Sequence, residues 1–295
     1  MSGPIFKGSI PALITPFANG RVDEQAFQDF VEWQIEQGSH GLVPCGTTGE
    51  SPTLSHEEDM RVASLCVEVA HGRVPVIAGT GSNSTDEAIA LTRHAKEAGA
   101  DAVLVVAPYY NKPTQEGLYQ HYKEIHDAVE IPIVIYNVPG RTSVKVSPET
   151  MARLAKLPQI VGIKDATADL TYMADTRMLV GDDFTYLSGE DPTVVPYLAL
   201  GGHGCISVTA NVAPRLCAEL HEAWQKGDVA TVRAIDDRLM PLHRALFVET
   251  NPAPVKFAAN LLGKCENRVR LPLVTVSADT ETRVREAMAH AGLIN

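Results

Sequence analysis

Cysteine is scarce in this sequence, and its spacing does not suit cross-linking. The 295 residues contain five cysteines, and no two of them form a CxxC pair. They are Cys45, Cys66, Cys205, Cys217 and Cys265. The odd count and the lack of close pairs argue against a disulfide framework and against a structural zinc site. We therefore expect a reducing, cytoplasmic setting.

Long apolar runs and an excess of positive charge are also missing. No stretch approaches the length of a membrane span, and residues 1–17 have no apolar run long enough for a signal peptide. The formal net charge of −11 argues against a nucleic-acid partner and against an anionic membrane surface. An anionic substrate would therefore depend on a few local positive groups.

The chain is rich in short apolar runs that alternate with helical patterns. Eight runs are expected to be strands: residues 9–17, 41–46, 75–81, 102–108, 132–139, 160–167, 184–191 and 204–210. Most are continuous rather than alternating, which is typical of parallel strands buried on both faces. Between them lie helix-start signals at Asp23, Ser55 with Glu58, Ser84 with Glu87, Ser147 with Pro148, and Asp191 with Pro192.

This alternation predicts an α/β fold, a (β/α)8 TIM barrel over residues 1–225. A doubly wound open sheet is the alternative, but it would usually show a GxGxxG turn after the first strand, and ITPFANG lacks one. From about residue 211 the strand signals fade and helical patterns follow. Residues 226–295 are accordingly predicted to form a C-terminal helical domain.

A lysine inside the apolar run VGIKDAT, residues 161–167, is the most informative single residue. Apolar surroundings disfavour the charged form of a lysine, and a neutral lysine amine forms Schiff bases with carbonyl substrates. Two alternatives remain open: a pair with Asp165, or a buried stem with the amine in water. Lys256 is the other candidate for a Schiff-base lysine, although it falls on a predicted helix.

Other side chains at predicted strand ends suit imine chemistry. Tyr136 supplies a phenol for proton transfer, Thr47 and Thr48 supply hydroxyls, and Arg141 offers a fork for a carboxylate. Each residue also has a purely structural interpretation. Tyr136 would cap the barrel with its hydroxyl in water, the two threonines would be ordinary turn residues, and Arg141 would be a solvated loop arginine.

Several weaker motifs point elsewhere. The glycines of GGHG, residues 201–204, suit a phosphate or a close backbone approach to a small ligand. His203 has no neighbouring metal ligands in the sequence. Glu190 with Asp191 resembles a metal pair, but the following proline favours a helix start. Cys45 and Cys205 have no histidine nearby to act as a base, which favours packing.

Seven motifs are spread over nearly the whole chain: GTTGES, PYYNKPTQEGLYQHY, IYNVPGRT, GIKDAT, LSGED, GGHGCISVTAN and NPAPVK. Together, and in this order, they resemble the motifs of the dihydrodipicolinate synthase (4-hydroxy-tetrahydrodipicolinate synthase) family. The resemblance implies a homotetramer that condenses pyruvate with L-aspartate 4-semialdehyde in lysine (diaminopimelate) biosynthesis, a lyase reaction without a metal or organic cofactor.

The resemblance also implies roles for individual residues. Lys164 matches the Schiff-base lysine, and the proton relay matches Tyr136, Thr47 and Tyr110, the last entering from a neighbouring subunit. Thr48 matches the group that holds the pyruvate carboxylate, and Arg141 the group that receives the semialdehyde carboxylate. Gly189 and Ile206 match positions that line the pocket.

An allosteric lysine site is a further expectation from the resemblance. Its residues fall at Ser51, His56, Asn83, Glu87 and Tyr109. Asp59 stands where some members carry a second histidine, which leaves sensitivity to lysine open.

Two other functions remain open on the sequence. One is a related pyruvate-dependent aldolase, such as an N-acetylneuraminate lyase or a keto-deoxy sugar-acid aldolase; Arg141 argues against it, because this arginine suits a short substrate ending in a carboxylate. The other is a catalytically silent barrel that binds a keto acid, which would form no adduct on Lys164.

Overall fold

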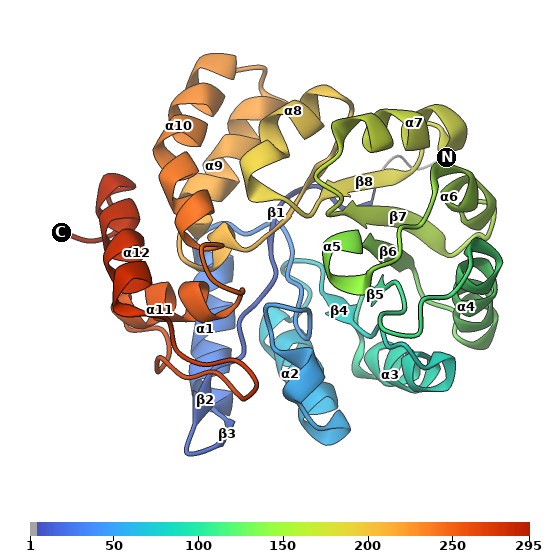
Figure 1. Ribbon diagram of the computed structural model, residues 1–295, viewed down its shortest axis with the longest axis horizontal. Coiled ribbons are helices and arrows are strands. Elements are labelled where there is room, and N and C mark those ends of the chain that lie inside the picture. Colours follow the sequence, from blue (N-terminus) through green and yellow to red (C-terminus); the bar gives the residue numbers. More distant parts are fainter. Residues whose placement is uncertain (1–4) are drawn as a thin grey trace.

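A curled sheet of parallel strands lies at the centre of the molecule, with helices around it (Figure 1). The computed structural model describes residues 5–295; residues 1–4 of the predicted barrel domain lie outside this range. The strands are β1 (Gly8–Pro11), β4 (Ile77–Gly79), β5 (Ala102–Val106), β6 (Ile133–Asn137), β7 (Ile160–Asp165), β8 (Thr185–Ser188) and β9 (Gly204–Ser207). Their order, β1-β9-β8-β7-β6-β5-β4, follows the chain around a barrel.

The second of the eight predicted strands, residues 41–46, closes this barrel without forming a regular ladder. Parallel bridges join Ala12 to Val43 and Leu42 to Val76. The Gly79 N–H also donates to the Pro44 carbonyl at 2.9 Å. Pro44 has no N–H to donate, and Cys45 has a φ of 57°, so a regular ladder does not continue beyond this point. The predicted eightfold barrel is confirmed, with one strand reduced to bridges.

Helices cover the outside of the sheet. They are α1 (Glu24–Glu36), α2 (His56–Ala70), α3 (Thr85–Ala98), α4 (Gln115–Ala128), α6 (Pro148–Leu154), α7 (Leu170–Val180), α8 (Val194–Ala199) and α9 (Pro214–Gln225). Shorter elements between them are α5 (Pro139–Thr142), η1 (Ser51–Thr53), η2 (Asp191–Thr193), η3 (Thr209–Asn211) and the hairpin β2 (Phe17–Ala18) with β3 (Arg21–Val22). Asp23, Ser55 and Ser147 cap α1, α2 and α6 as predicted.

The predicted capping box at α3 is only half present. The Ser84 hydroxyl accepts from the backbone N–H of Glu87. The Glu87 carboxylate does not return the bond: it accepts from the Ser82 hydroxyl and lies 2.6 Å from His56 Nε2. A carboxylate expected to cap the start of a helix thus faces a surface histidine instead.

The prediction that Asp191 is a helix N-cap is wrong. Asp191 lies inside η2, and Glu190 occupies the cap position. The buried Asp191 carboxylate accepts hydrogen bonds from the Ser207 hydroxyl, the Val208 N–H at 2.9 Å and the Thr209 N–H at 3.2 Å. It therefore holds the turn after β9, where backbone N–H groups have no partner in the sheet.

Two apolar clusters make up the core. The smaller one fills the barrel and contains Ile10, Val43, Ile77, Leu104, Val134, Tyr136, Leu187 and Ile206 among others. The larger one lies between the strands and the surrounding helices. Because the interior of the barrel is filled with side chains, a ligand is expected at the end of the barrel rather than along its axis.

The last part of the chain is helical, as predicted: α10 (Val229–Ala245), α11 (Ala253–Leu261) and α12 (Ala278–His290). These helices pack beside α9 at one side of the barrel (Figure 1). The predicted division at residues 225 and 226 falls between α9 and α10 and stays a prediction. Across residues 5–295, every helix is too short or too polar to cross a membrane.

Candidate active site

The lysine singled out by the sequence lies near the carboxyl end of β7 and is 6% exposed. The register of the sheet places Tyr136 of β6 and Leu187 of β8 beside Lys164. The Lys164 Nζ atom lies 4.2 Å from the centroid of the Tyr136 ring. An amine and a phenol are thus adjacent at the end of the barrel on which barrel enzymes carry their chemistry.

The first alternative for Lys164, a pair with Asp165, does not agree with the structure. Successive residues of a strand point to opposite faces, and the neighbouring Asp165 carboxylate accepts from the Thr167 N–H at 2.9 Å. Burial raises the pKa of Asp165 to about 6. The lysines that form ion pairs within residues 5–295 are Lys123, Lys145 and Lys256. Lys164 is therefore both buried and free of a carboxylate partner in the described chain.

Gly189, which follows β8, permits the close packing around this lysine. A Cβ at this position would lie 3.1 Å from Lys164 Cε and 2.7 Å from the Ala166 Cβ. Ile206 of β9 is fully buried inside the barrel. Both predicted pocket positions thus lie in the same end of the barrel as Lys164.

A Gly189→Ala variant tests this packing. The added methyl group displaces the Lys164 side chain, and a misplacement of about 1 Å costs about 10²-fold in rate. We expect kcat/KM to fall by about that factor in a steady-state assay. Gly140→Ala is the matched control, because a Cβ there meets nothing within 4 Å. Equal rates for the two variants would contradict the assigned role.

A cavity of about 390 Å³ opens beside Tyr136, the neighbour of Lys164 in the sheet. Thr47, Tyr136 and Arg141 line it, and so do Ser51, His56, Glu87 and Tyr109 of the predicted lysine site. Two sets of residues that the sequence analysis treats as separate therefore border one continuous cavity in the single chain. A small ligand with one or two carboxylates fits a space of this size.

The remaining carboxylate-binding candidates are held by a residue that the sequence analysis did not assign. Thr48 is 3% exposed, and the Asn251 side-chain amide donates to its hydroxyl oxygen at 3.0 Å. The Arg141 guanidinium, in α5, donates to the Asn251 backbone carbonyl at 3.3 Å. Asn251 begins the motif NPAPVK, which belongs to the resemblance but carries no chemical signal of its own.

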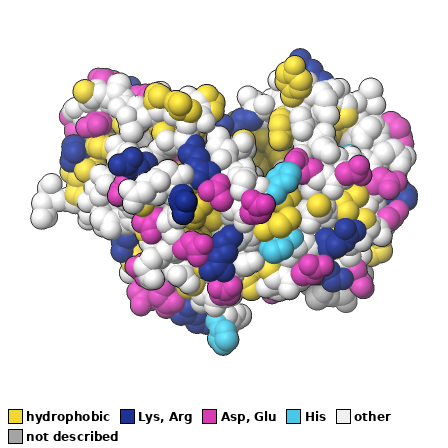
Figure 2. All heavy atoms as spheres, turned by 90° about the horizontal axis from the view of Figure 1, so that it is seen from below, with side chains coloured by type: hydrophobic (Ala, Val, Ile, Leu, Met, Phe, Trp, Pro, Cys, Tyr) yellow, Lys and Arg dark blue, Asp and Glu magenta, His cyan; other side chains and the backbone are white. Residues whose placement is uncertain are grey.

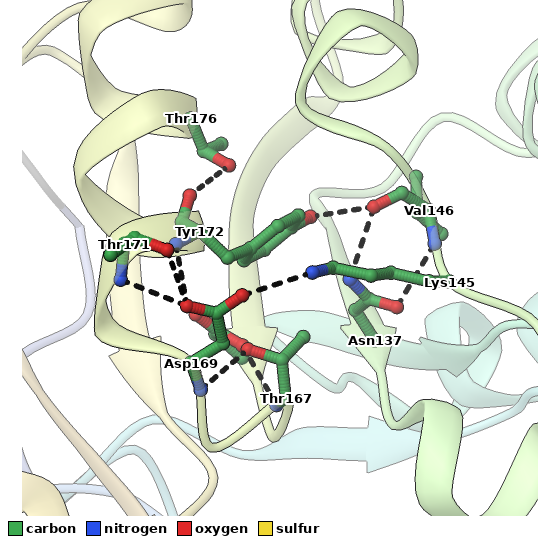
Figure 3. Close-up of polar contacts among 9 residues, drawn as sticks. Asn137, Lys145, Val146, Thr167, Asp169, Thr171, Tyr172 and Thr176 are labelled. Carbon is green, nitrogen blue, oxygen red and sulfur yellow. Dashed lines mark hydrogen bonds and ion pairs between the residues drawn. The ribbon is translucent and has the colours of Figure 1, made fainter.

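The loop that carries Arg141 is anchored just outside the barrel (Figure 3). Asn137, directly after Tyr136, donates to the Val146 carbonyl and accepts from the Val146 N–H, at 3.2 and 3.1 Å. The Tyr172 hydroxyl donates to the same carbonyl at 2.9 Å. These bonds tie the far end of the loop, at Val146, to β6 and α7. The other end continues directly from β6, so Arg141 lies in a segment held at both ends.

Tyr110 does not join this group within one chain. Its side chain is 90% exposed, and its backbone has a φ of 68°. A large residue in this left-handed conformation carries backbone strain of about 1–3 kcal/mol. An exposed, strained tyrosine agrees with the expectation that this side chain acts outside its own subunit, which stays a prediction.

Four of the five residues of the predicted lysine site line the cavity, and Asn83 contacts one of them. His56 Nε2 is 2.6 Å from Glu87 Oε1, and the Asn83 side chain donates to the Tyr109 carbonyl at 3.2 Å. Asp59 also lines the cavity and is 5% exposed. Burial raises the pKa of Asp59 from 3.8 to about 7, so near neutral pH this carboxyl is in part uncharged.

Stability is expected to depend on pH through Asp59. Because the folded state holds its proton more tightly than the unfolded state, the carboxyl contributes stability that is complete below about pH 4 and is lost as pH rises through about 7. The shift corresponds to about 4 kcal/mol at most. The melting temperature of Asp59→Asn should therefore rise relative to wild type between about pH 5 and pH 8, whereas exposed Asp175→Asn should show a constant difference. A constant difference for both would contradict the assignment.

The weaker motifs have structural roles. The GGHG segment precedes β9, at the opposite end of the barrel from Lys164, so its interpretation as a phosphate site is wrong. His203 Nδ1 accepts from the Tyr186 N–H at 3.0 Å. Burial raises the pKa values of Cys45 and Cys205 well above the ordinary thiol value, which opposes a nucleophilic role.

Charge is mixed over the surface. On the face drawn in Figure 2, acidic and basic side chains are interspersed rather than segregated. In residues 5–295 no group of three or more His, Cys, Asp or Glu side chains is placed to hold a metal ion.

Comparison with known proteins agrees with this geometry over the whole chain. The model of the Dihydrodipicolinate synthetase family matches residues 5–291. The chain belongs to this family. It is 67% identical over 290 residues to the 4-hydroxy-tetrahydrodipicolinate synthase of Rhodospirillum centenum, covering 98% of this chain and 100% of that one. It is 61% identical to the Bradyrhizobium diazoefficiens enzyme of the same name, covering 98% of each chain.

Solved structures of family members share the fold. The dihydrodipicolinate synthase of Aquifex aeolicus has a TM-score of 0.96 at 48% identity, covering 98% of this chain and 99% of that one. The Acinetobacter baumannii enzyme, solved with pyruvate, has a TM-score of 0.95 at 47% identity and covers 98% and 99%. The Cyanidioschyzon merolae enzyme, solved with lysine bound, has 0.95 at 38% and covers 99% and 100%. The predicted barrel with its helical C-terminal part is confirmed.

Proposed function

We propose that this chain condenses pyruvate with L-aspartate 4-semialdehyde to give 4-hydroxy-tetrahydrodipicolinate, a lyase reaction of lysine (diaminopimelate) biosynthesis. The observation that carries the proposal is the buried Lys164, whose Nζ atom lies 4.2 Å from the Tyr136 ring centroid. High identity over full length to synthases of this name supports the same substrates.

In the proposed mechanism the neutral Lys164 amine attacks the ketone carbon of pyruvate, and loss of water gives an imine. The imine draws electrons from the pyruvate methyl group, which loses a proton to form an enamine. The enamine carbon attacks the aldehyde carbon, and the resulting alkoxide takes up a proton to become the hydroxyl group. The amine of the former semialdehyde then attacks the imine carbon, closes the ring and releases Lys164.

Each proton transfer requires a positioned acid or base. Tyr136 is adjacent to the lysine amine, and Thr47 lines the same cavity. We assign these two side chains, with Tyr110 of a neighbouring subunit, to the relay. Thr48 takes the carboxylate of pyruvate, because its hydroxyl lies buried at the same end of the barrel.

Borohydride reduction in the presence of pyruvate tests the proposal. An imine on Lys164 is reduced to a stable secondary amine, which intact mass and peptide mapping detect. Turnover of pyruvate with the semialdehyde should also exceed turnover with a panel of sugar acids. No adduct on Lys164 would contradict both the mechanism and the assignment to this reaction.

Arg141→Ala is expected to reduce use of the semialdehyde selectively. Hydrogen bonds to charged groups contribute about 1.5–3 kcal/mol, so kcat/KM for the semialdehyde should fall by about 10- to 100-fold. Pyruvate adduct formation should change little, because that step precedes entry of the aldehyde. Arg141→Lys keeps the charge but loses the fork and should be intermediate. Unchanged semialdehyde turnover would favour another pyruvate-dependent aldolase.

Assembly, regulation and location complete the proposal. The exposed Tyr110 supports an assembly in which subunits complete each other's sites, which we take to be a homotetramer; light scattering of the purified chain measures its mass. Lysine is proposed as an effector in the cleft around His56 and Glu87, and steady-state assays with added lysine test this. The five free cysteines agree with a cytoplasmic location.

A further inference from the structure

A buried ion pair links the C-terminal helices to the turn that carries Thr47 and Thr48. Both oxygens of the Glu50 carboxylate are used: Lys256 Nζ of α11 lies 2.6 Å from Oε1, and the Arg270 backbone N–H donates to Oε2 at 2.8 Å. Lys256 is fully buried, and Glu50 is 3% exposed. The reaction described above uses neither charge.

Stability alone is a weak reason for this pair. Burial lowers the pKa of Lys256, and the nearby Glu50 carboxylate opposes that shift. Removing two charges from water costs free energy that their attraction need not recover, and apolar residues often replace such pairs without loss of stability. A buried pair of this kind is better explained by the geometry that it imposes on its surroundings.

The geometry that it imposes is that of the Gly46–Ser51 turn. Glu50 has a φ of 58°, a left-handed conformation that a glutamate adopts at a cost. Its N–H donates to the Thr47 carbonyl at 3.1 Å, and the Gly49 N–H donates to the Gly46 carbonyl at 3.0 Å. Fixing the Glu50 side chain therefore fixes a tight turn that includes Thr47 and Thr48.

Asn251, five residues before Lys256, makes the second link. Its amide donates to the Thr48 hydroxyl oxygen, and its carbonyl accepts from Arg141, at 3.0 and 3.3 Å. A hydroxyl has one proton to donate. Because the Asn251 amide occupies the oxygen as a donor, the Thr48 proton is left to donate to a carboxylate ligand.

We propose that Asn251 and Lys256 are positioning residues for the reaction: Asn251 orients the Thr48 hydroxyl toward the pyruvate carboxylate, and Lys256 holds the Thr47–Thr48 turn through Glu50. The inference rests on the proposed function. It assigns to the segment NPAPVK a role in the chemistry of the barrel.

The two residues should affect different kinetic constants. Loss of Thr48 orientation weakens binding of pyruvate in ground and transition states alike, which raises KM and leaves kcat unchanged. Displacement of the whole turn also moves Thr47, so kcat should fall together with a rise in KM.

Asn251→Ala and Asn251→Asp test the first part through the pyruvate dependence of borohydride trapping. Alanine removes the donor, and the half-saturating pyruvate concentration should rise about tenfold, the loss of one hydrogen bond to a charged group. Aspartate is closer in shape to asparagine, but it accepts the Thr48 proton and repels the pyruvate carboxylate, so its effect should be larger. A purely structural role predicts the opposite order and would overturn the inference.

The double variant Glu50→Gln/Lys256→Met tests the second part without leaving a buried charge unpaired. We expect a melting temperature near that of wild type, a raised KM for pyruvate and a kcat lowered about tenfold or more. The control is Arg61→Met, which removes an exposed pair with Glu24 and should leave both constants unchanged.

The outcomes separate the two proposals. Absence of an adduct in the wild-type protein would defeat the proposed function. An adduct in the wild type together with unchanged pyruvate dependence in the Asn251 variants and in the double variant would defeat the positioning role alone. A double variant that does not fold would contradict the expected melting temperature and overturn the positioning role of Lys256, and the order of the two Asn251 variants would then decide the role of Asn251 alone.

Discussion

Lys164→Met is expected to abolish the pyruvate adduct and to reduce kcat by about 10⁴-fold or more, the scale of losing a covalent nucleophile. Methionine has a similar length and lacks the amine, so the apolar packing around the site is kept. Because a buried amine is costly to desolvate, the melting temperature should equal or exceed that of wild type. Steady-state rates, intact mass after borohydride and a thermal melt measure the three effects.

Lys123→Met is the matched control, because this lysine is exposed on α4 and pairs with Asp127 one turn away. It should form the adduct and turn over at the wild-type rate. An adduct that persists in Lys164→Met would show that another amine reacts, and Lys256 would be the first to examine. Loss of activity accompanied by unfolding would contradict the view that the buried amine costs stability.

The barrel was predictable from the sequence because its signals are local and repeated. Continuous apolar runs, caps such as Asp23 and Ser147, and the alternation of strand and helix each indicate one element. The exception is residues 41–46, where Pro44 and the left-handed Cys45 limit pairing to two bridges. Apolar content alone did not reveal how short this ladder is.

Asp191 shows where a local pattern fails. An aspartate before proline is typical of a helix start, yet its carboxylate binds the turn after β9, at Ser207, Val208 and Thr209. A contact between residues 16–18 positions apart depends on the closed barrel. Single-sequence reasoning therefore favours the wrong partner for a buried carboxylate.

The site, too, was predicted only where its signals are local in the sequence. Lys164 and Tyr136 stand out because a lysine in a strand is rare and both lie at strand ends. Asn251 and Lys256 do not stand out, because their partners Thr48 and Glu50 are about 200 residues earlier in the chain. The predicted interpretation of Lys256 as a helix residue is confirmed, but its pairing required the folded structure.

Tyr136→Phe is expected to separate imine formation from proton transfer. Phenylalanine keeps the ring 4.2 Å from the Lys164 amine and removes only the hydroxyl, so packing and stability should change little. Acid–base catalysis contributes about 10²- to 10⁴-fold, and kcat should fall by that amount. The borohydride adduct should still form, more slowly, since attack of the amine needs no covalent help from the phenol.

Tyr119→Phe serves as the control, because Tyr119 lies on α4 and is not part of the cavity lining. A kcat that falls equally in both variants, or not at all in Tyr136→Phe, would remove the phenol from the relay and leave Thr47 as the one relay residue assigned to the same subunit as Lys164.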